Sequence, residues 1–382
     1  MTPLHRNALW TSLALLVTAI VLFMADRPQM AGAALVVFFA LAAFGARGHE
    51  KLRGISFSLL IFAGVTFAMC WPAPLVRWGE FELSTLIVPL LQIIMFGMGT
   101  AMSARDFVGV AKAPKAVFIG LGCQFTIMPF VGAALALVFG FEPEVAAGVI
   151  LVGAAPSGLA SNVMSYIAKA NLALSVTLTT VATLLAPFIT PFYMQWLAGQ
   201  YIPIDAWGMM WDIIQITILP IAAGLIFNRF LHGRTDWLDR LMPRVSMLGI
   251  VLILMIMTAG GRDNLLEIGL LLIVVALMHN LAGYSLGYWC CRALKLDEKS
   301  CRTIAFEVGL QNAGLATGLA QTMGKMATVG LAPTVFGSLM NITGATLATW
   351  WRDRPTGEAD ETVSQPVASP VFDSKKGTPS GA

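Results

Sequence analysis

The feature that most constrains this chain is a series of twelve long apolar runs that are poor in charge. They cover residues 7–25, 30–46, 54–76, 83–103, 116–140, 145–168, 171–198, 207–228, 245–260, 264–291, 302–323 and 330–351. A helix needs about 20 apolar residues to cross a bilayer. Apolar residues make up 57% of the chain and charged residues only 12%, and a soluble domain of this size lacks the interior to bury them. We therefore predict an all-α polytopic membrane protein, which excludes a soluble enzyme or a nucleic-acid-binding protein.

The positions of lysine and arginine predict the orientation in the membrane. If the runs alternate from a cytoplasmic N-terminus, only Arg27, Arg77, Arg262 and Lys325 lie outside, and the other twenty of the 24 basic residues (24 − 4) lie inside. Basic residues favour cytoplasmic loops, so we predict that both termini are cytoplasmic. The first run resembles a signal peptide but lacks a small-residue cleavage site, and we expect it to remain as a helix.

Composition also predicts how the chain divides into parts. Residues 1–53 hold the first two runs, which we expect to form an appended N-terminal hairpin, and residues 54–352 hold the other ten. Residues 353–382 are rich in Pro, Ser, Thr and Gly and have no apolar periodicity. Such a segment cannot bury enough apolar surface to fold, so we predict a disordered cytoplasmic tail.

The chain lacks the motifs of transition-metal or nucleotide chemistry. Its five cysteines form no CxxC pair, and its four histidines are far apart. The segment 318–325 lacks the glycine spacing of a phosphate-binding loop, and Met326 stands where such a loop has serine or threonine. We expect His279, inside an apolar run, to be a packing group rather than a proton relay.

Two of the apolar runs are interrupted by small and polar residues. The run 145–168 contains the sequence GAAPSGLASN at 153–162, in which Pro156 removes a backbone donor. The run 302–323 contains FEVGLQNAG at 306–314, which places Glu307 near the middle of the membrane with no basic residue beside it in sequence. Polar groups at this depth are costly and usually face partners or a cavity, so we predict that both helices are broken.

The order of the runs suggests an internal repeat. Without the N-terminal hairpin, ten runs remain as two sets of five, and the two interrupted runs are each fourth in their set. Because five is odd, the second set would be inverted in the membrane relative to the first. Interrupted helices at matching places in an inverted repeat indicate the substrate and ion sites of a transporter. We therefore predict a ten-helix inverted-repeat core (5+5) with two discontinuous crossing helices.

The polar residues near the two interruptions are oxygen donors. Ser161, Asn162, Glu307 and Gln311 supply hydroxyl, amide and carboxylate oxygens, and Ser175 and Thr179 lie four residues apart on one face of the run 171–198. The set includes neither imidazole nor thiolate, so it suits a hard cation such as sodium.

At these positions the chain resembles the bacterial branch of the bile acid:sodium symporter family. The matching stretches are IMFGMG at 94–99, GLASNVM at 158–164, ANLALS at 170–175, LMHNLAG at 277–283, EVGLQN at 307–312 and NITG at 341–344. The resemblance covers residues 54–352. It implies a panel domain, made of the first, second, sixth and seventh of the ten helices, and a core domain whose fourth and ninth helices cross at unwound centres.

The resemblance also implies two sodium ions as coupling ions and no organic cofactor. One ion would be bound by Ser161, Asn162, Ser175, Thr179 and Glu307, and the other by Gln124, Glu307 and Gln311 with the backbone carbonyls of Val308 and Leu310. The substrate would lie near Leu159, Ala160, Asn312 and Asn341. Close bacterial relatives often carry threonine in place of Leu159 and histidine in place of Met340, which leaves the substrate open.

The function predicted on this basis is sodium-coupled import of a small organic anion by alternating access, in a bacterial inner membrane. The substrate class is a carboxylate such as pantoate or a 2-oxo acid, rather than a sterol acid. An alternative is a proton-coupled or exporting organic-anion carrier of the same superfamily. An intramembrane enzyme is disfavoured, because no base or metal cluster accompanies Glu307 in the predicted polar centre.

Overall fold

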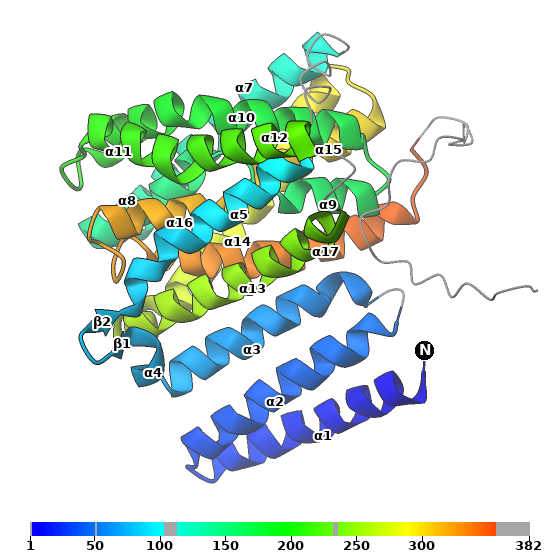
Figure 1. Ribbon diagram of the computed structural model, residues 1–382, viewed down its shortest axis with the longest axis vertical. Helices are drawn as coiled ribbons and strands as arrows, with labels where there is room; N and C mark the ends of the chain where they lie inside the picture. The colour runs from blue at the N-terminus through cyan, green and yellow to red at the C-terminus, as the bar shows by residue number, and fades with distance from the viewer. Residues whose placement is uncertain (1, 50–51, 103–112, 232–235, 357–382) are drawn as a thin grey trace, which may run out of the picture.

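The computed structural model describes residues 2–49, 52–102, 113–231 and 236–356, and nearly all of this part of the chain is helical (Figure 1). Most of the helices run side by side along one direction, as in a membrane bundle. Each predicted apolar run corresponds to one helix or to a pair of consecutive helices. The fold class predicted from the sequence, an all-α polytopic membrane protein, is therefore confirmed.

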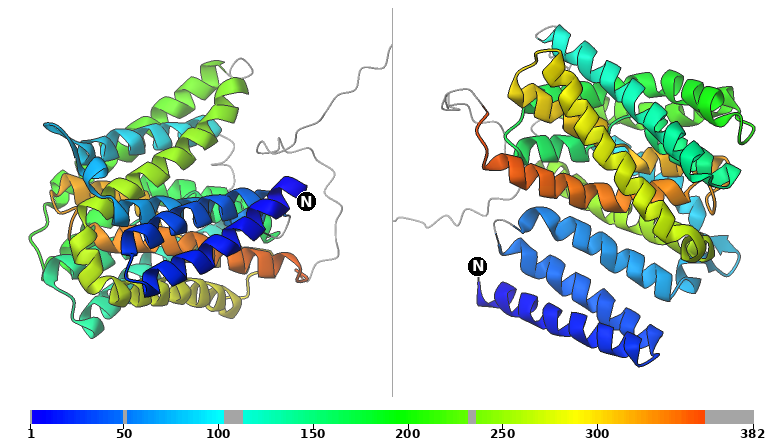
Figure 2. Two further views of the ribbon diagram at one scale, coloured as in Figure 1. Left: turned by 90° about the horizontal axis from the view of Figure 1, so that it is seen from below. Right: turned by 180° about the vertical axis from the view of Figure 1, so that it is seen from behind.

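The first two runs form a hairpin of α1 (Pro3–Met24) and α2 (Pro28–Arg47), which lies at one edge of the bundle (Figure 1; Figure 2, right). Proline occupies the first turn of both helices, where its missing N–H costs nothing. The helix α2 packs between α1 and α3 (Ser56–Cys70), and Ser56 Oγ donates a hydrogen bond to Ala43 O over 2.7 Å. The outer face of α1 exposes large apolar side chains such as Trp10 and Phe23, as expected for a helix that contacts lipid.

A first group of helices contains those expected to form the panel, and we call them the panel helices. They are α3, α5 (Ile87–Ala101), α11 (Ala206–Ile213) with the π-helical turn Ile214–Ile218, α12 (Leu219–Leu231) and α13 (Asp236–Gly260). The helix α5 packs against both α12 and α13, and α13 packs against α3. Between α3 and α5 lie the short helix α4 (Ala73–Val76) and a small antiparallel hairpin of β1 (Arg77–Trp78) and β2 (Phe81–Glu82).

The remaining helices form a second group that surrounds the two interrupted runs, and we call them the core helices. They are α7 (Pro114–Phe139), α8 (Pro143–Ala154), α9 (Ala160–Ile167), α10 (Leu172–Tyr193), α14 (Arg262–Ala293), α15 (Glu298–Gly309), α16 (Ala313–Thr322) and α17 (Leu331–Arg352). The helices α7 and α14 pack against one another and against α15. The division into panel and core domains and the 5+5 repeat remain predictions.

Within the described residues, eight helices are long and apolar enough to span a membrane. The predicted runs outside this set are 54–76, 145–168, 302–323 and 330–351. Two of these runs are divided, into α8 and α9 and into α15 and α16, so that each half is too short to cross alone. The helix α3 is also short, because the chain leaves the helix at Trp71.

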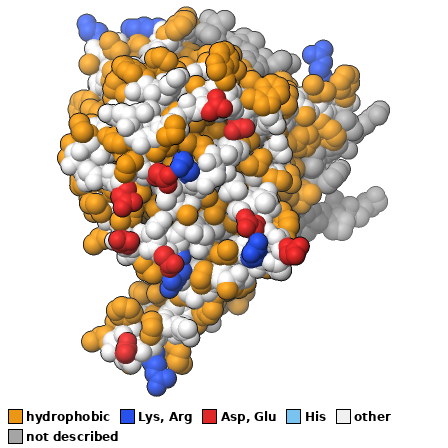
Figure 3. All heavy atoms as spheres, turned by 90° about the vertical axis from the view of Figure 1, so that its left-hand side faces the viewer, with side chains coloured by type: hydrophobic (Ala, Val, Ile, Leu, Met, Phe, Trp, Pro, Cys, Tyr) orange, Lys and Arg blue, Asp and Glu red, His pale blue; other side chains and the backbone are white. Residues whose placement is uncertain are grey.

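The ends of the bundle carry most of its charge. The end at which α1 joins α2 faces the viewer in Figure 3, and acidic and basic side chains are scattered there among apolar ones. At the other end, the carbonyls of Arg354 and Pro355 accept hydrogen bonds from Arg302. A buried side chain thus contacts the backbone of these two residues, which belong to the predicted tail 353–382. The prediction of disorder for 357–382 lies outside the described residues.

Candidate functional site

The two interrupted helices cross at their breaks, as the sequence predicts. The helix α8 ends at Ala154 and α9 begins at Ala160, while α15 ends at Gly309 and α16 begins at Ala313. The connecting stretches pair through their backbones: Gly158 N–H donates to Leu310 O over 3.0 Å, and Asn312 N–H donates to Pro156 O over 2.7 Å. Backbone groups released from the helices thus satisfy one another inside the bundle, where water is scarce.

A glycine makes this close approach feasible. A Cβ atom on Gly158 would lie 3.0 Å from the carbonyl oxygen of Gln311, which is closer than an ordinary van der Waals contact. Any other residue at this position would require the backbone at Gln311 to move by a few tenths of an ångström.

Beside the crossing, the Glu307 carboxylate is the centre of a buried hydrogen-bonded cluster. Its side chain is only 1% exposed. Ser175 Oγ donates to Glu307 Oε1 over 2.5 Å, and Thr179 Oγ1 lies 3.1 and 2.9 Å from Oε1 and Oε2. Ser175 Oγ also lies 2.8 Å from Asn162 Oδ1, and Ser161 Oγ lies 3.3 Å from Thr179 Oγ1. The five side chains assigned from the sequence to one sodium ion therefore lie together, contributed by α9, α10 and α15.

Ser157 also belongs to this cluster, and sequence reasoning did not assign it to an ion. Its Oγ donates to Glu307 Oε2 over 2.6 Å, and the side chain is 1% exposed. In the sequence, Ser157 follows the helix-breaking Pro156, and a hydroxyl there is expected to satisfy freed backbone groups. In the sequence, its position directly before Gly158 is the signal that it faces the crossing instead.

Among the residues that the structure describes, no ion pair with a basic side chain involves Glu307. Its partners are neutral hydroxyl groups. Transfer of an isolated carboxylate into a membrane interior is costly unless a cation or a proton neutralises it. The cluster therefore has the chemistry of a site for a hard cation, with carboxylate, hydroxyl and amide oxygens around one point.

The residues assigned to the second ion form an adjoining group. Gln124 Nε2 donates to Gln311 Oε1 over 2.9 Å, and Gln311 Nε2 donates to Val308 O over 2.5 Å. Gln124 Oε1 is buried and has no hydrogen-bond partner among the residues that the structure describes. A buried acceptor without a partner is costly, so this oxygen is available to a cation. The carbonyl of Leu310 already accepts the Gly158 N–H, which leaves only its second lone pair.

Of the four residues assigned to the substrate, Leu159, Ala160 and Asn312 lie at the two breaks, and Asn341 lies on α17. Leu159 is 38% exposed at the start of α9, followed by the half-buried Ala160. Asn312 is the N-cap of α16, where its Oδ1 accepts a hydrogen bond from Leu315 N–H over 3.0 Å. Asn341 Nδ2 donates to Gly337 O over 2.8 Å within α17. The oxygen of Asn312 and the amide nitrogen of Asn341 are thus already engaged, and the other polar atom of each side chain would have to contact a ligand.

His279 lies apart from the cluster. It is 1% exposed, its Nε2 is 3.0 Å from Met128 O, and its ring packs edge-on against Phe336. A small void of about 10 Å³ beside it is lined by apolar side chains such as Val149 and Leu272. These surroundings agree with a packing role.

The chain is similar in sequence to known proteins. The model of the Sodium Bile acid symporter family matches residues 88–268. An uncharacterized sodium-dependent transporter of Bacillus subtilis, YocS, is 40% identical over 80% of this chain and 93% of its own length. The rice protein named "Probable sodium/metabolite cotransporter BASS2, chloroplastic" is 32% identical over 80% of this chain and 72% of its own. The rabbit ileal sodium/bile acid cotransporter is 32% identical over 63% and 70%.

The relatives are sodium-dependent transporters or cotransporters, and their names differ in the substrate that they mention. With 40% identity over most of both chains in one case, the relationship extends over the panel helices and the core helices alike. This chain is a multi-pass membrane protein that belongs to the sodium bile acid symporter family, a family of sodium-coupled transporters and not of enzymes.

Proposed function

We propose that the protein imports a small organic anion together with two sodium ions, by alternating access across a bacterial inner membrane. The observation that carries the proposal is the Glu307 carboxylate, buried at the crossing of two broken helices and surrounded by hydroxyl and amide oxygens. A structural membrane protein has no need of an unpaired carboxylate at this depth. A sodium-coupled carrier needs one, because the carboxylate binds the cation and releases it in each cycle.

Charge balance supports two sodium ions with one monovalent anion. Glu307 is shared by both assigned ion sites and contributes one negative charge, and the substrate contributes a second. Two sodium ions then make the loaded site close to neutral, as low-dielectric surroundings require. Since Glu307 stays with the protein, each cycle carries about one net positive charge inward.

The crossing also supports an anionic substrate. The helices α9 and α16 both begin at the break, and the first turns of helices carry N–H groups without intrahelical partners and a partial positive charge. A carboxylate placed between these two helix starts would be favoured, and the exposed Leu159 would contact its apolar part. We therefore propose a short carboxylate, such as pantoate or a 2-oxo acid, in preference to a sterol acid.

The packing of the two half-helices supports a cytoplasm-facing conformation. The helix α16 packs against α5 and α11 of the panel helices, and Gly318 lies directly against Leu91. The helix α9, at the end of the bundle where α1 begins, packs against α10, α15 and α17 and exposes Leu159, Val163 and Tyr166. If α1 begins in the cytoplasm, the exposed face of α9 lies on the cytoplasmic side of the crossing.

The test is uptake into proteoliposomes loaded without sodium. Labelled pantoate, a 2-oxo acid and a sterol acid are offered separately, with an inward gradient of sodium or of choline. We expect concentrative uptake of a short carboxylate only with sodium, a sigmoidal dependence on sodium, and faster uptake at an inside-negative potential. The variant Glu307→Gln keeps the shape, removes the charge and should abolish coupled uptake.

Two results would overturn the proposal. Uptake against a gradient by Glu307→Gln would mean that the ion sites lie elsewhere. Equal uptake driven by a pH gradient without sodium would favour the proton-coupled alternative, in which Glu307 carries a proton instead of sodium.

A further inference from the structure

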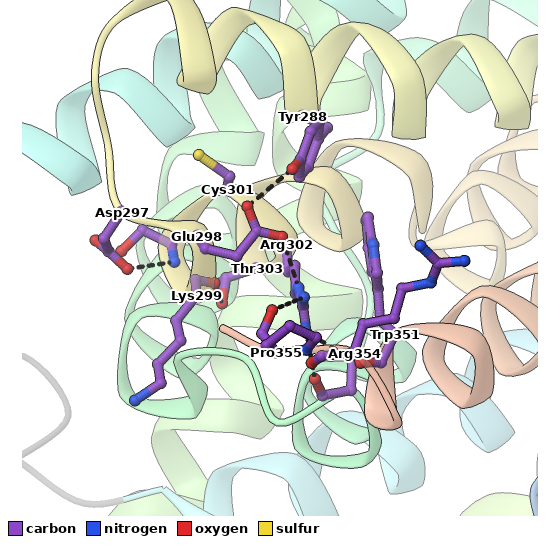
Figure 4. Close-up of polar contacts among 12 residues, drawn as sticks. Tyr288, Asp297, Glu298, Lys299, Cys301, Arg302, Thr303, Trp351, Arg354 and Pro355 are labelled. Carbon is purple, nitrogen blue, oxygen red and sulfur yellow. Dashed lines mark hydrogen bonds and ion pairs between the residues drawn. The ribbon is translucent and has the colours of Figure 1, made fainter. Parts of the chain in front are cut away.

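The cytoplasmic end of the core helices contains a buried cation that no part of the ion site explains. Arg302, near the start of α15, is only 2% exposed (Figure 4). Its Nε donates to Glu298 Oε1 over 2.8 Å, and its two terminal nitrogens donate to four backbone carbonyls. These carbonyls belong to Ala168 at 3.5 Å, Trp351 at 3.0 Å, Arg354 at 3.3 Å and Pro355 at 2.9 Å.

These partners are suited to a guanidinium and not to another cation. Ala168 is the C-cap residue of α9 and Trp351 lies in the last turn of α17, where carbonyls lack intrahelical partners and carry partial negative charge. Arginine offers five donors in a planar arrangement, whereas lysine offers three at a single point. One side chain can therefore join α15, α9, α17 and the segment that follows α17.

The neighbouring residue Thr303 joins α15 to a further helix. Its Oγ1 accepts a hydrogen bond from Asn171 N–H over 2.9 Å and lies 3.1 Å from Asn171 O. Asn171 is the N-cap residue of α10, and its own side chain accepts from Leu174 N–H. Arg302 and Thr303, with Glu298, are called the cytoplasmic cluster below.

The helices that meet at the cytoplasmic cluster are the helices that meet at Glu307. The helix α9 carries Ser161 and Asn162, α10 carries Ser175 and Thr179, and α15 carries Glu307 itself. The helix α15 is thus joined to α9 and to α10 in two places, once in the hydrogen-bonded cluster at Glu307 and once near the cytoplasmic surface. A shift of any one helix at its cytoplasmic end would move its oxygen atoms relative to the other two.

The opposite ends of the two broken helices are joined by a different contact. Glu144, at the start of α8, pairs with Lys325 and accepts a hydrogen bond from Thr328, both in the segment between α16 and α17. The start of the first broken helix is therefore tied to the end of the second at one surface, and Arg302 and Ala168 form the reciprocal tie at the other. The two broken helices are therefore joined to one another at both surfaces as well as at their crossing.

We propose that Arg302 and Thr303 are positioning residues for sodium: the cytoplasmic cluster fixes the separation of α9, α10 and α15, and so sets the affinity of the site at Glu307. The inference rests on the proposed function, since it assumes that the cluster at Glu307 binds sodium. Neither residue touches the ion. Both act through the helices that carry the ligands.

The experiment measures sodium binding without transport. The purified protein is melted in detergent at a series of NaCl concentrations, with choline chloride at constant ionic strength, and the sodium concentration for half of the stabilising shift is recorded. Arg302→Lys keeps the charge but loses the planar donors, and Thr303→Val keeps the shape but loses the hydroxyl. We expect each to raise the half-saturating sodium concentration about tenfold, the loss of roughly one charged or buried hydrogen bond.

Matched controls separate positioning from stability. Thr303→Ser should restore the wild-type sodium concentration. Arg292→Gln removes a largely exposed arginine that lies 3.7 Å from the same Glu298, and should leave it unchanged. Truncation after Thr356 should also leave it unchanged, while truncation after Asp353, which removes the carbonyls of Arg354 and Pro355, should raise it.

The possible results distinguish a positioning role from a purely structural one. The inference is overturned if Arg302→Lys, Thr303→Val and the truncation after Asp353 all lower the melting temperature in choline but leave the half-saturating sodium concentration unchanged. The cluster would then have only a structural role. Should Arg302→Lys fail to fold, Thr303→Val and the truncation decide. The absence of any sodium-specific shift in the wild-type protein would instead refute the proposed function itself.

Discussion

Ser157 Oγ donates a hydrogen bond to Glu307 Oε2 over 2.6 Å, although the two residues are 150 positions apart in the chain. The contact joins the break between α8 and α9 directly to the carboxylate of α15. A hydroxyl in contact with this carboxylate can also turn a lone pair toward a bound cation. We therefore propose that Ser157 joins the five side chains assigned to the first ion.

Ser157→Ala should weaken sodium binding without abolishing transport, because Glu307 keeps Ser175 and Thr179 as partners. The loss of one hydrogen bond to a charged group is about 1.5–3 kcal/mol, which we expect to appear as a sodium requirement roughly tenfold to a hundredfold higher in uptake assays. The matched control is Ser165→Ala on α9, a buried hydroxyl that has no hydrogen-bond partner within the described part of the chain. If both variants behave alike, Ser157 has no special role.

Gln124→Ala should reduce the cooperativity of sodium activation. The unpartnered Oε1 of Gln124 is expected to bind the second ion, so its removal should move the Hill coefficient of uptake toward one while a single sodium still binds. Gln92→Ala provides the comparison, since Gln92 donates to Gln215 O on the panel helices and lies outside the cluster. An unchanged Hill coefficient in Gln124→Ala would remove this residue from the ion site.

Asn312→Ser should weaken substrate binding and spare sodium. Serine is as good an N-cap as asparagine, so α16 keeps its cap while the amide group disappears. We expect a loss of order 1–3 kcal/mol in substrate affinity, with sodium affinity unchanged in the absence of substrate. Asn341→Ala should act in the same direction. Equal losses for sodium and substrate would place Asn312 in an ion site.

Glu144→Gln should destabilise the protein at neutral pH but not in acid. The hydrogen bonds from Lys325 and Thr328, in that order, lower the pKa of Glu144, which lies just before the predicted span, below its ordinary value of 4.5. A lowered pKa contributes stability above pH 4.5, and this stability is lost as the pH falls through the folded-state value.

The effect should be under about 1 kcal/mol, because the Glu144 side chain is 36% exposed. Thermal unfolding at pH 7 and at successively lower pH, through the folded-state pKa, measures it, with Glu142→Gln at the preceding exposed acid as the control. A difference from wild type that does not shrink as the pH falls would mean that the substitution acts through packing.

The distribution of lysine and arginine predicts that both termini are cytoplasmic. A reporter enzyme that is active only outside the cytoplasm should be silent when fused after Thr356 and active when inserted at Gly79, in the turn between β1 and β2. Gly79 has a φ of +63° in an exposed turn, which tolerates insertion. Activity of the fusion after Thr356 would contradict an even number of spans.

The sequence was sufficient to predict the helices and the breaks in two of them, because both depend on local chemistry. Apolar runs of spanning length can be stable only as helices in lipid, and Pro156 cannot donate a hydrogen bond whatever surrounds it. Glu307 was identifiable for the same reason, as a carboxylate in an apolar run. The positions of Ser175 and Thr179 on one helix face followed from the helical period.

Local chemistry did not determine which of these groups meet: the family resemblance grouped them, and only the tertiary structure brings them into contact. Gln124 and Gln311 are 187 positions apart, and no local rule brings one beside the other. Ser157 could have bonded to its own backbone, and only the crossing turns it toward Glu307. In the sequence, Arg302 is one of the basic residues predicted to be cytoplasmic. The fold buries it against the ends of α9 and α17. There it also contacts the backbone of Arg354 and Pro355, which composition assigned to the tail. Hydropathy determines which segments enter the membrane, but contacts across the bundle depend on how helices distant in sequence pack together.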